Sequence, residues 1–231
     1  MAGQVQARRD LAHGRVGGQP VKRPVEVAIY VEGGGDSTAD KNALRIGMDV
    51  LLTSLKDRVR AKAWRWKLVF CGGRRAAYEK FINAREHAGS NDIVILLVDS
   101  EGPVTVDTKA AHLKQRQGDE GWDLTGVPED HIHFMAQTME AWIVADPEAL
   151  ATYYGQGFRT NALPARQNLE DEAKPNVAEK LKAATRDSKT KGEYHKIAHA
   201  SQLLAKIDPT KVRARCPHAE RFFTTLERLI G

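Results

Sequence analysis

Residues 25–36 read VEVAIYVEGGGD, and this stretch decides the fold. Its first seven residues, 25–31, are mostly β-branched and apolar, which predicts a buried strand. The three glycines at 33–35 end the strand, and helical spacing of apolar side chains runs from residue 39 to about residue 59. A strand, a glycine turn and a helix in that order predict the first half of a β-α-β unit.

The same pattern occurs twice more along the chain. Residues 66–71 (WKLVFC) are a second predicted strand, which Gly72 and Gly73 end, and residues 74–87 have helical spacing. Residues 93–98 (IVILLV) are continuously apolar, as expected of a strand that is covered on both faces. The alternation predicts a Rossmann-like α/β fold, in which crossover helices join the strands of a parallel sheet.

The rest of the chain is expected to complete this sheet and to add helices. Residues 99–130 are polar and turn-rich, which predicts a long loop. A strand at 132–135 and a helix over about 138–145 follow, and Asp146 is expected to cap the next helix in front of a proline. Pro175 opens a C-terminal region that we expect to hold three or four short helices.

Composition excludes several classes of protein. Of 231 residues, 42% are hydrophobic and 28% charged, which is ordinary for a globular protein. Two cysteines are too few for a disulfide scaffold or a four-cysteine zinc site, so we expect reduced thiols and a cytoplasmic location. The sequence has no apolar run of the length that a membrane span or a secretory leader needs, so we expect neither. No serine, cysteine or histidine triad is apparent, so acyl-transfer chemistry is not expected.

Charge divides the chain into three predicted parts. Residues 1–23 carry a net charge of +4 without a hydrophobic period, which predicts a flexible basic tail. Residues 24–173 carry −6 and form the predicted α/β domain, and residues 174–231 carry +7 and form a basic helical extension that packs on it. An acidic body between basic ends suits a protein that gathers divalent cations and contacts phosphates, although solvated surface charge gives the same pattern.

Carboxylates follow two of the predicted strands. Glu32 and Asp36 flank the glycine turn after the first strand, and Asp99 and Glu101 follow the third. Functional side chains of parallel sheets gather beyond the carboxyl ends of the strands, so we expect these four groups at one edge. Crowded carboxylates need a counter-charge, which Mg²⁺ or Mn²⁺ supplies. The alternative is that they are loop residues that cap the next helix, above all Asp36.

The glycine turn itself matches neither common nucleotide-binding loop. No Gly-Lys-Ser/Thr sequence follows it, so it is not a Walker loop. Thr38 stands where the third glycine of a dinucleotide fingerprint belongs.

Basic and aromatic residues elsewhere are candidates for contact with nucleic acid or phosphate. A short cluster is formed by Lys189, Lys191, Tyr194, His195 and Lys196. Its lysines could neutralise phosphates, and the tyrosine could stack on a base or bond a phosphate. Arg74 follows the second glycine pair at a predicted helix start, where it could meet a phosphate at the same sheet edge. A solvated loop is the alternative for the cluster, and exposure to water is the alternative for Arg74.

Glu140 lies in the apolar run of residues 139–145, where a half-buried carboxylate needs a partner. Glu140 could belong to the acidic site or form a structural ion pair, and the sequence leaves both alternatives open. Trp122, in the predicted long loop, is the one tryptophan that is not obviously a core residue.

The acidic pattern resembles the Toprim fold, which topoisomerases, primases and overcoming-lysogenization-defect nucleases share. In detail the chain resembles an uncharacterised bacterial Toprim-like group, domain-of-unknown-function family 4276, over about residues 25–225. The stretches that carry this resemblance are YVEGGGD (30–36), CGGR (71–74), LVDSE (97–101), MEAW (139–142) through Asp146, YGQGF (154–158) and KGEYHK (191–196).

The resemblance implies roles for the acidic residues. Glu32 would be a general acid/base or a metal ligand, and Asp36, Asp99 and Glu101 would be ligands of Mg²⁺ or Mn²⁺. Glu101 stands where the usual Toprim pattern has Asp.

Two functions follow as hypotheses. The first is a metal-dependent phosphodiesterase, that is, a nuclease of Toprim-like fold, for which the resemblance implies bacterial anti-phage defence beside a partner ATPase of the AAA or ABC type. The second is a non-catalytic regulatory subunit that binds nucleic acid or an ATPase through a degenerate site. The sequence does not distinguish DNA from RNA as the substrate and predicts no oligomeric state.

Overall fold

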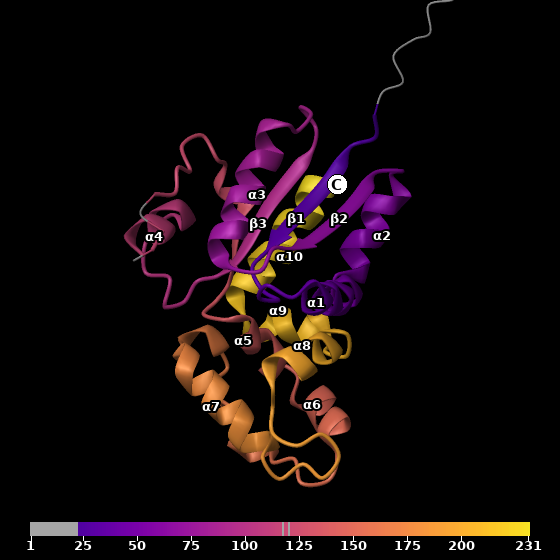
Figure 1. Cartoon of the computed structure of the whole chain (residues 1–231), viewed down its shortest axis with the longest axis vertical. Helices are drawn as coiled ribbons and strands as arrows, with labels where there is room; N and C mark the ends of the chain where they lie inside the picture. Colours follow the sequence, from indigo (N-terminus) through magenta and orange to yellow (C-terminus); the bar gives the residue numbers. More distant parts are fainter. Residues whose placement is uncertain (1–22, 117, 120) are drawn as a thin grey trace, which may run out of the picture.

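The computed structural model describes residues 23–116, 118–119 and 121–231, which form an α/β fold (Figure 1). The predicted flexible tail over residues 1–23 lies outside the described residues except for Arg23. The Rossmann-like α/β class with a helical C-terminal region, expected from the sequence, is confirmed.

The described strands form one parallel sheet in the order β2-β1-β3-β4. Their bounds are Glu26–Val31 for β1, Arg65–Phe70 for β2, Ile93–Asp99 for β3 and Ile132–Met135 for β4. Val31, the last residue of β1, is in register with Phe70 of β2 and Leu97 of β3. The three strands therefore end at nearly the same level, and the residues that follow them meet at one edge of the sheet.

Two helices, rather than the one predicted over residues 39–59, connect β1 to β2. Helix α1 spans Thr38–Leu51 and α2 spans Thr53–Ala61, with a break at Leu52. Leu52 is fully buried, as are the apolar side chains on either side of it, so the hydrophobic period continues through the break. For that reason the spacing alone predicted a single helix. Helix α3, Arg74–Glu86, connects β2 to β3 as expected.

The segment predicted as a loop over residues 99–130 contains a short helix, α4, which spans Lys109–Gln115. The hydroxyl of Thr108 caps this helix by accepting a hydrogen bond from the backbone N–H of Ala111 at 3.1 Å. Leu113 is the one buried residue of α4, so the sequence carries too weak an apolar period to predict this helix. Later in the segment, Trp122 is buried and stacks on Tyr78 of α3 with ring centroids 4.5 Å apart.

Six α-helices of the described residues follow β4. They are α5 (Met139–Val144), α6 (Pro147–Tyr154), α7 (Lys174–Thr185), α8 (Lys196–Leu204), α9 (Pro209–Arg215) and α10 (Pro217–Ile230). Asp146 caps α6 in front of Pro147, as predicted, by accepting from the N–H of Ala149 at 3.2 Å. Helices α7 and α8 lie beyond the carboxyl ends of the strands (Figure 1).

Both faces of the sheet are covered. On one face, Ile29 and Leu97 share an apolar cluster with residues of α1, α2 and the C-terminal helices, among them Leu203 and Phe222. On the other face, Tyr30 and Leu96 pack with α3 and α4. Helix α8 packs on α1, and α10 packs on β4. The domain boundary expected at residue 173 stays a prediction. None of the described helices combines the length and the apolar character of a membrane span.

Candidate active site

Glu32 and Asp99 lie together at the carboxyl ends of β1 and β3. Because these strands are neighbours, the backbone N–H of Asp99 donates a hydrogen bond to Oε2 of Glu32 at 3.2 Å. From β1 the chain passes to β2 on one side of it, and from β2 it returns to β3 on the other side of β1. The strand order therefore reverses at the carboxyl ends of β1 and β3. Ligands of open α/β sheets bind at such a point.

Arg74, from the first turn of α3, holds this pair from one side. Its Nη1 donates to Oε2 of Glu32 at 3.1 Å and to the backbone oxygen of Asp99, and its Nε donates to Oδ2 of Asp119 at 2.8 Å. The guanidinium lies 5.2 Å from the ring centroid of Trp122. Only 10% of the side chain is exposed, and in the described part of the chain its buried Nη2 has no hydrogen-bond partner. An unpaired N–H of a buried cation is costly, so this atom favours an additional acceptor.

Asp99 is the most deeply placed carboxylate of the site. Its Oδ1 accepts from the backbone N–H of Met139 at 3.0 Å, and its Oδ2 lies 3.4 Å from the hydroxyl of Thr138. The ammonium of Lys174 is 3.6 Å from the same Oδ2. Burial, followed by the charge of Glu32, raises the pKa of Asp99 to about 7, although nearby lysines oppose this shift. Burial likewise raises the pKa of Glu32.

Glu101 faces the same cluster through a constrained backbone. Its φ is +65°, a left-handed conformation that costs a non-glycine residue about 1–3 kcal/mol. Its N–H donates to the backbone oxygen of Gln137 at 3.0 Å. Its carboxylate lies 2.6 Å from Nζ of Lys174 and 3.7 Å from Arg116. Burial alone would raise the pKa of Glu101, but Lys174 holds it below its ordinary value.

Asp36 is more exposed than the other three carboxylates. It lines a hollow of about 210 Å³ that Lys196 and Ile197 also line. Among the described residues, Asp36 belongs to no group of three or more His, Cys, Asp or Glu side chains that could hold a metal ion. The alternative that Asp36 caps α1 is wrong, because the hydroxyl of Ser37 caps this helix by accepting from the N–H of Asp40 at 3.2 Å.

Glu140 belongs to a buried polar network that adjoins Asp99. Its Oε2 accepts from the hydroxyl of Thr138 at 2.5 Å, and its Oε1 accepts from the hydroxyl of Tyr194 at 3.2 Å. Nζ of Lys196 lies 3.1 Å from Oε1. Burial would raise the pKa of Glu140, but the charge of Lys196 keeps it below its ordinary value. Glu140 is therefore an ion-paired residue, and the Thr138 hydroxyl also lies within 3.4 Å of Asp99.

The basic and aromatic cluster does not form one exposed surface. The prediction that Tyr194 could stack on a base is wrong, because its ring is buried and its hydroxyl donates to Glu140. Lys196 is half exposed but paired with Glu140. His195 is exposed and caps α8, since its ring accepts from the N–H of Ala198 at 3.4 Å. Lys191 is exposed, with its ammonium 4.9 Å from the ring centroid of Tyr153.

The chemistry of the donors decides whether a divalent cation fits this site. In the described part of the chain, no three His, Cys, Asp or Glu side chains stand close enough together to hold a metal ion as they lie. Glu32, Asp99 and Glu101 nevertheless offer hard carboxylate oxygens at one sheet edge, the donors that Mg²⁺ and Mn²⁺ prefer. Their repulsion is not fully compensated, since the charge of Glu101 adds to burial in raising the pKa of Glu32. These three residues fit the cation in chemistry, and Arg74 and Lys174 supply the present counter-charge.

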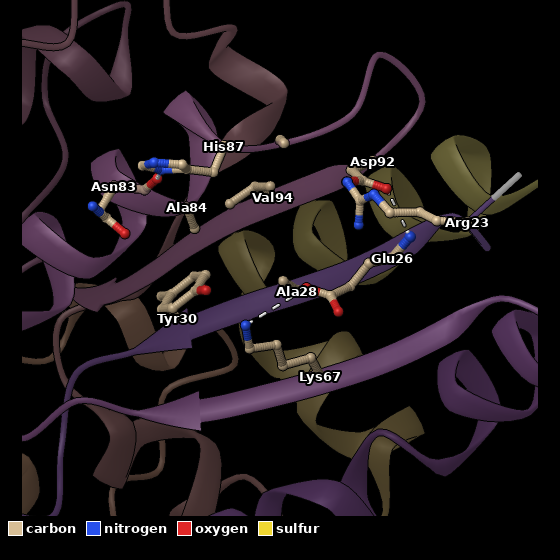
Figure 2. Close-up of a pocket in the computed structure, with 11 residues that line it drawn as sticks. Arg23, Glu26, Ala28, Tyr30, Lys67, Asn83, Ala84, His87, Asp92 and Val94 are labelled. Atoms are coloured by element: carbon tan, nitrogen blue, oxygen red, sulfur yellow. Dashed lines mark hydrogen bonds and ion pairs between the residues drawn. The ribbon is translucent and has the colours of Figure 1, made fainter. Parts of the chain in front are cut away.

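A second hollow of about 210 Å³ lies on the sheet face beside α3, away from this edge (Figure 2). Its charged side chains are paired with one another, Arg23 with Asp92 and Lys67 with Glu26 at 3.6 Å. Tyr30 lies at one end, with Nζ of Lys67 5.7 Å from its ring centroid. None of the buried donors that lack a partner among the described residues lines this hollow, so it is a weaker candidate for chemistry than the edge at Glu32 and Asp99.

Four residues of the site were missed by the sequence analysis. They are Lys174, Arg116, Asp119 and Thr138. None stands in a motif. Arg116 and Asp119 follow α4, Thr138 directly precedes α5, and Lys174 begins α7. The one available signal was the position of Lys174 at the start of the basic C-terminal region.

A family model described as a domain of unknown function, DUF4276, matches residues 31–227. No curated protein and no solved structure matches the chain. The matched range begins at the last residue of β1 and ends in α10, so it includes the sheet edge and the C-terminal helices that supply Lys174 and Lys196. On this match over most of its length, the chain belongs to the DUF4276 family.

Proposed function

We propose that the protein is a metal-dependent phosphodiesterase, a nuclease whose site lies at the carboxyl ends of β1 and β3. One observation carries the proposal: a buried arginine, fixed by Glu32, Asp119 and the backbone of Asp99, has an Nη2 beside these carboxylates that finds no partner among the described residues. Phosphodiester hydrolysis needs a cationic donor for the phosphate oxygens and a group that moves a proton. Both are combined here at the edge where α/β folds bind ligands.

Each residue has a role in this proposal. Arg74 binds a non-bridging phosphate oxygen, because a fixed guanidinium donor stabilises the charge that develops there. Glu32 takes the proton of the attacking water, a role suited by the raised pKa of its partly exposed carboxyl. Asp99 and Glu101, with Glu32, would hold Mg²⁺ or Mn²⁺, which when bound supplies a Lewis acid for the phosphate.

One observation favours the second candidate, a regulatory subunit with a degenerate site. The carboxylates already have internal cations: Arg74 on Glu32, Lys174 on Asp99 and Glu101, and Lys196 on Glu140. A cluster of carboxylates that carries its own cations can be a structural network. In this case the protein binds nucleic acid or an ATPase partner without cutting. Either function would be exercised in the cytoplasm, in the setting of anti-phage defence that the Toprim-like resemblance implies.

The test is a cleavage assay with the full chain and labelled DNA and RNA, in Mg²⁺, Mn²⁺ or EDTA, with and without a candidate partner ATPase. Glu32→Gln keeps the shape of the side chain and is expected to lower the cleavage rate by about a hundredfold or more. Glu79→Gln, on the exposed face of α3, is the matched control and should cut at the wild-type rate. Metal-independent binding without cleavage in every condition supports the regulatory subunit instead.

A further inference from the structure

Lys174 places its ammonium group between the carboxylates of Asp99, the last residue of β3, and Glu101. Its Nζ is 2.6 Å from Oε1 of Glu101 and 3.6 Å from Oδ2 of Asp99. Lys174 is the first residue of α7 and lies 73 positions beyond Glu101 in the chain. One positive charge therefore bridges the two residues that the proposed function assigns to the divalent cation.

The position of Lys174 is built by the fold rather than reached by a free surface lysine. The backbone N–H of Lys174 donates to Oε1 of Gln137 at 3.3 Å, and Nε2 of the same glutamine donates to the backbone oxygen of Glu170 at 3.0 Å. Gln137 also accepts, through its backbone oxygen, from the N–H of Glu101. The start of α7 and the turn after β3 are thus fixed on one glutamine, which sets the distance between Lys174 and its carboxylates.

We propose that Lys174 is an internal competitor of the divalent cation for Asp99 and Glu101, and that it sets the metal affinity of the site. The inference rests on the proposed function and adds to it a residue that controls when the site is loaded. An ammonium group and a divalent cation cannot share the same carboxylate oxygens at close range, because like charges a few ångströms apart repel strongly at a partly buried site. Binding of the cation therefore requires the ammonium of Lys174 to leave.

Removing the charge of Lys174 should tighten metal binding. In Lys174→Gln, Asp99 and Glu101 lose the counter-charge that they share, while Arg116 remains 3.7 Å from Glu101. The variant should therefore melt at a lower temperature than the wild type in EDTA. Added Mg²⁺ or Mn²⁺ should raise its melting temperature by more than that of the wild type. Lys174→Arg keeps the charge and should behave as the wild type does.

The experiment is isothermal titration calorimetry of the full chain with MgCl₂ and MnCl₂, together with thermal unfolding in EDTA and in millimolar metal. We expect the affinity of Lys174→Gln for metal to exceed that of the wild type by about tenfold or more. Lys182→Gln is the matched control, because it removes the same charge from an exposed position of the same helix and should leave the affinity unchanged. Lys174→Met, which keeps most of the side-chain volume, replaces the glutamine variant if that variant does not fold.

The outcomes separate this inference from the proposed function. Wild-type metal binding that is equally tight in Lys174→Gln overturns the inference and leaves the proposed metal site standing. An equal loss of melting temperature with and without metal likewise overturns it, because a purely structural lysine would give that result. Binding by Lys174→Gln alone supports the inference and overturns metal-dependent activity of the wild type. Absence of binding in both proteins overturns the inference together with the metal role of the site.

Discussion

Glu32 and Asp99 are joined directly: the backbone N–H of Asp99 donates to Oε2 of Glu32 at 3.2 Å. Nη1 of Arg74 donates to the same oxygen at 3.1 Å. A single carboxylate oxygen thus connects the ends of β1 and β3 with the first turn of α3. Substitutions of Glu32, Asp99 or Arg74 should therefore change ligand binding at the carboxyl ends of β1 and β3 more than they change the fold.

Asp99→Asn should remove the response of the protein to divalent cations. The substitution keeps the acceptor for Met139 but removes the charge that a cation would neutralise. Millimolar Mg²⁺ or Mn²⁺ should raise the melting temperature of the wild type and leave that of the variant unchanged. Asp57→Asn, an exposed change on α2, is the control and should respond as the wild type does. An equal metal-induced shift in all three proteins would contradict a site at Asp99.

The stability of the protein should depend on pH through Asp99. The pKa of this carboxyl is about 7 in the folded state, against 3.8 as its ordinary value, so between these values the folded state binds more protons than the unfolded state. The free energy of unfolding contributed by this group is therefore fully present below about pH 4 and is lost as the pH rises toward 7. Asp99→Asn lacks this loss, so its stability relative to the wild type should increase across the window. Urea denaturation at several pH values measures the free energy of unfolding of both proteins. A difference between them that does not change with pH would contradict the raised pKa of Asp99.

Arg74→Lys should weaken binding of nucleic acid. A lysine keeps the charge but cannot contact Glu32, Asp119 and the backbone of Asp99 together, so the fixed donor for a phosphate oxygen is lost. We expect binding in EDTA to weaken by about tenfold and the free energy of unfolding to fall by about 1–3 kcal/mol. Arg75→Lys alters the neighbouring, exposed arginine and should leave both unchanged. Wild-type binding by Arg74→Lys would place the phosphate contact elsewhere.

Tyr194→Phe should separate stability from binding. The variant loses the hydroxyl that donates to the buried Glu140, which should lower the free energy of unfolding by about 1–2 kcal/mol. Because the ring is buried, binding of labelled DNA or RNA should not change.

Lys191→Ala, at an exposed position of the same segment, should instead weaken binding of nucleic acid and reduce the salt dependence of that binding. Loss of binding in Tyr194→Phe at unchanged stability would restore the role that the sequence predicted for this tyrosine.

Gly47→Ala should force α8 away from α1. A Cβ at position 47 would lie 2.1 Å from the backbone oxygen of Ser201, a contact that the two helices can relieve only by moving apart. We expect a loss of about 1–3 kcal/mol or more in the free energy of unfolding, measured by chemical denaturation. Gly73→Ala is the control, since that glycine has an ordinary φ of −69° and no atom within 4 Å of its added Cβ. Equal stability of both variants would contradict the close packing of α8 on α1.

The sequence by itself determined the strands, their parallel arrangement and the meeting of Glu32 with Asp99. These follow from local patterns: β-branched runs form strands, glycines end them, and residues after neighbouring parallel strands share an edge. The cap at Asp146 was predictable for the same reason, since a cap depends on residues within one turn. Burial of Glu140 could also be predicted from its apolar neighbours, but its partner could not.

Only the tertiary structure decided which charges neutralise the site. Lys174 reaches Glu101 across 73 positions, and Arg74 reaches Asp119 across 45, through contacts set by the directions in which helices pack. The same packing buries the ring of Tyr194 and leaves Asp36 exposed. Local spacing fixes which face of a helix or strand a residue occupies. Which helix or strand packs against that face depends on the whole core. The same packing therefore decides which basic side chain pairs with each carboxylate of the site.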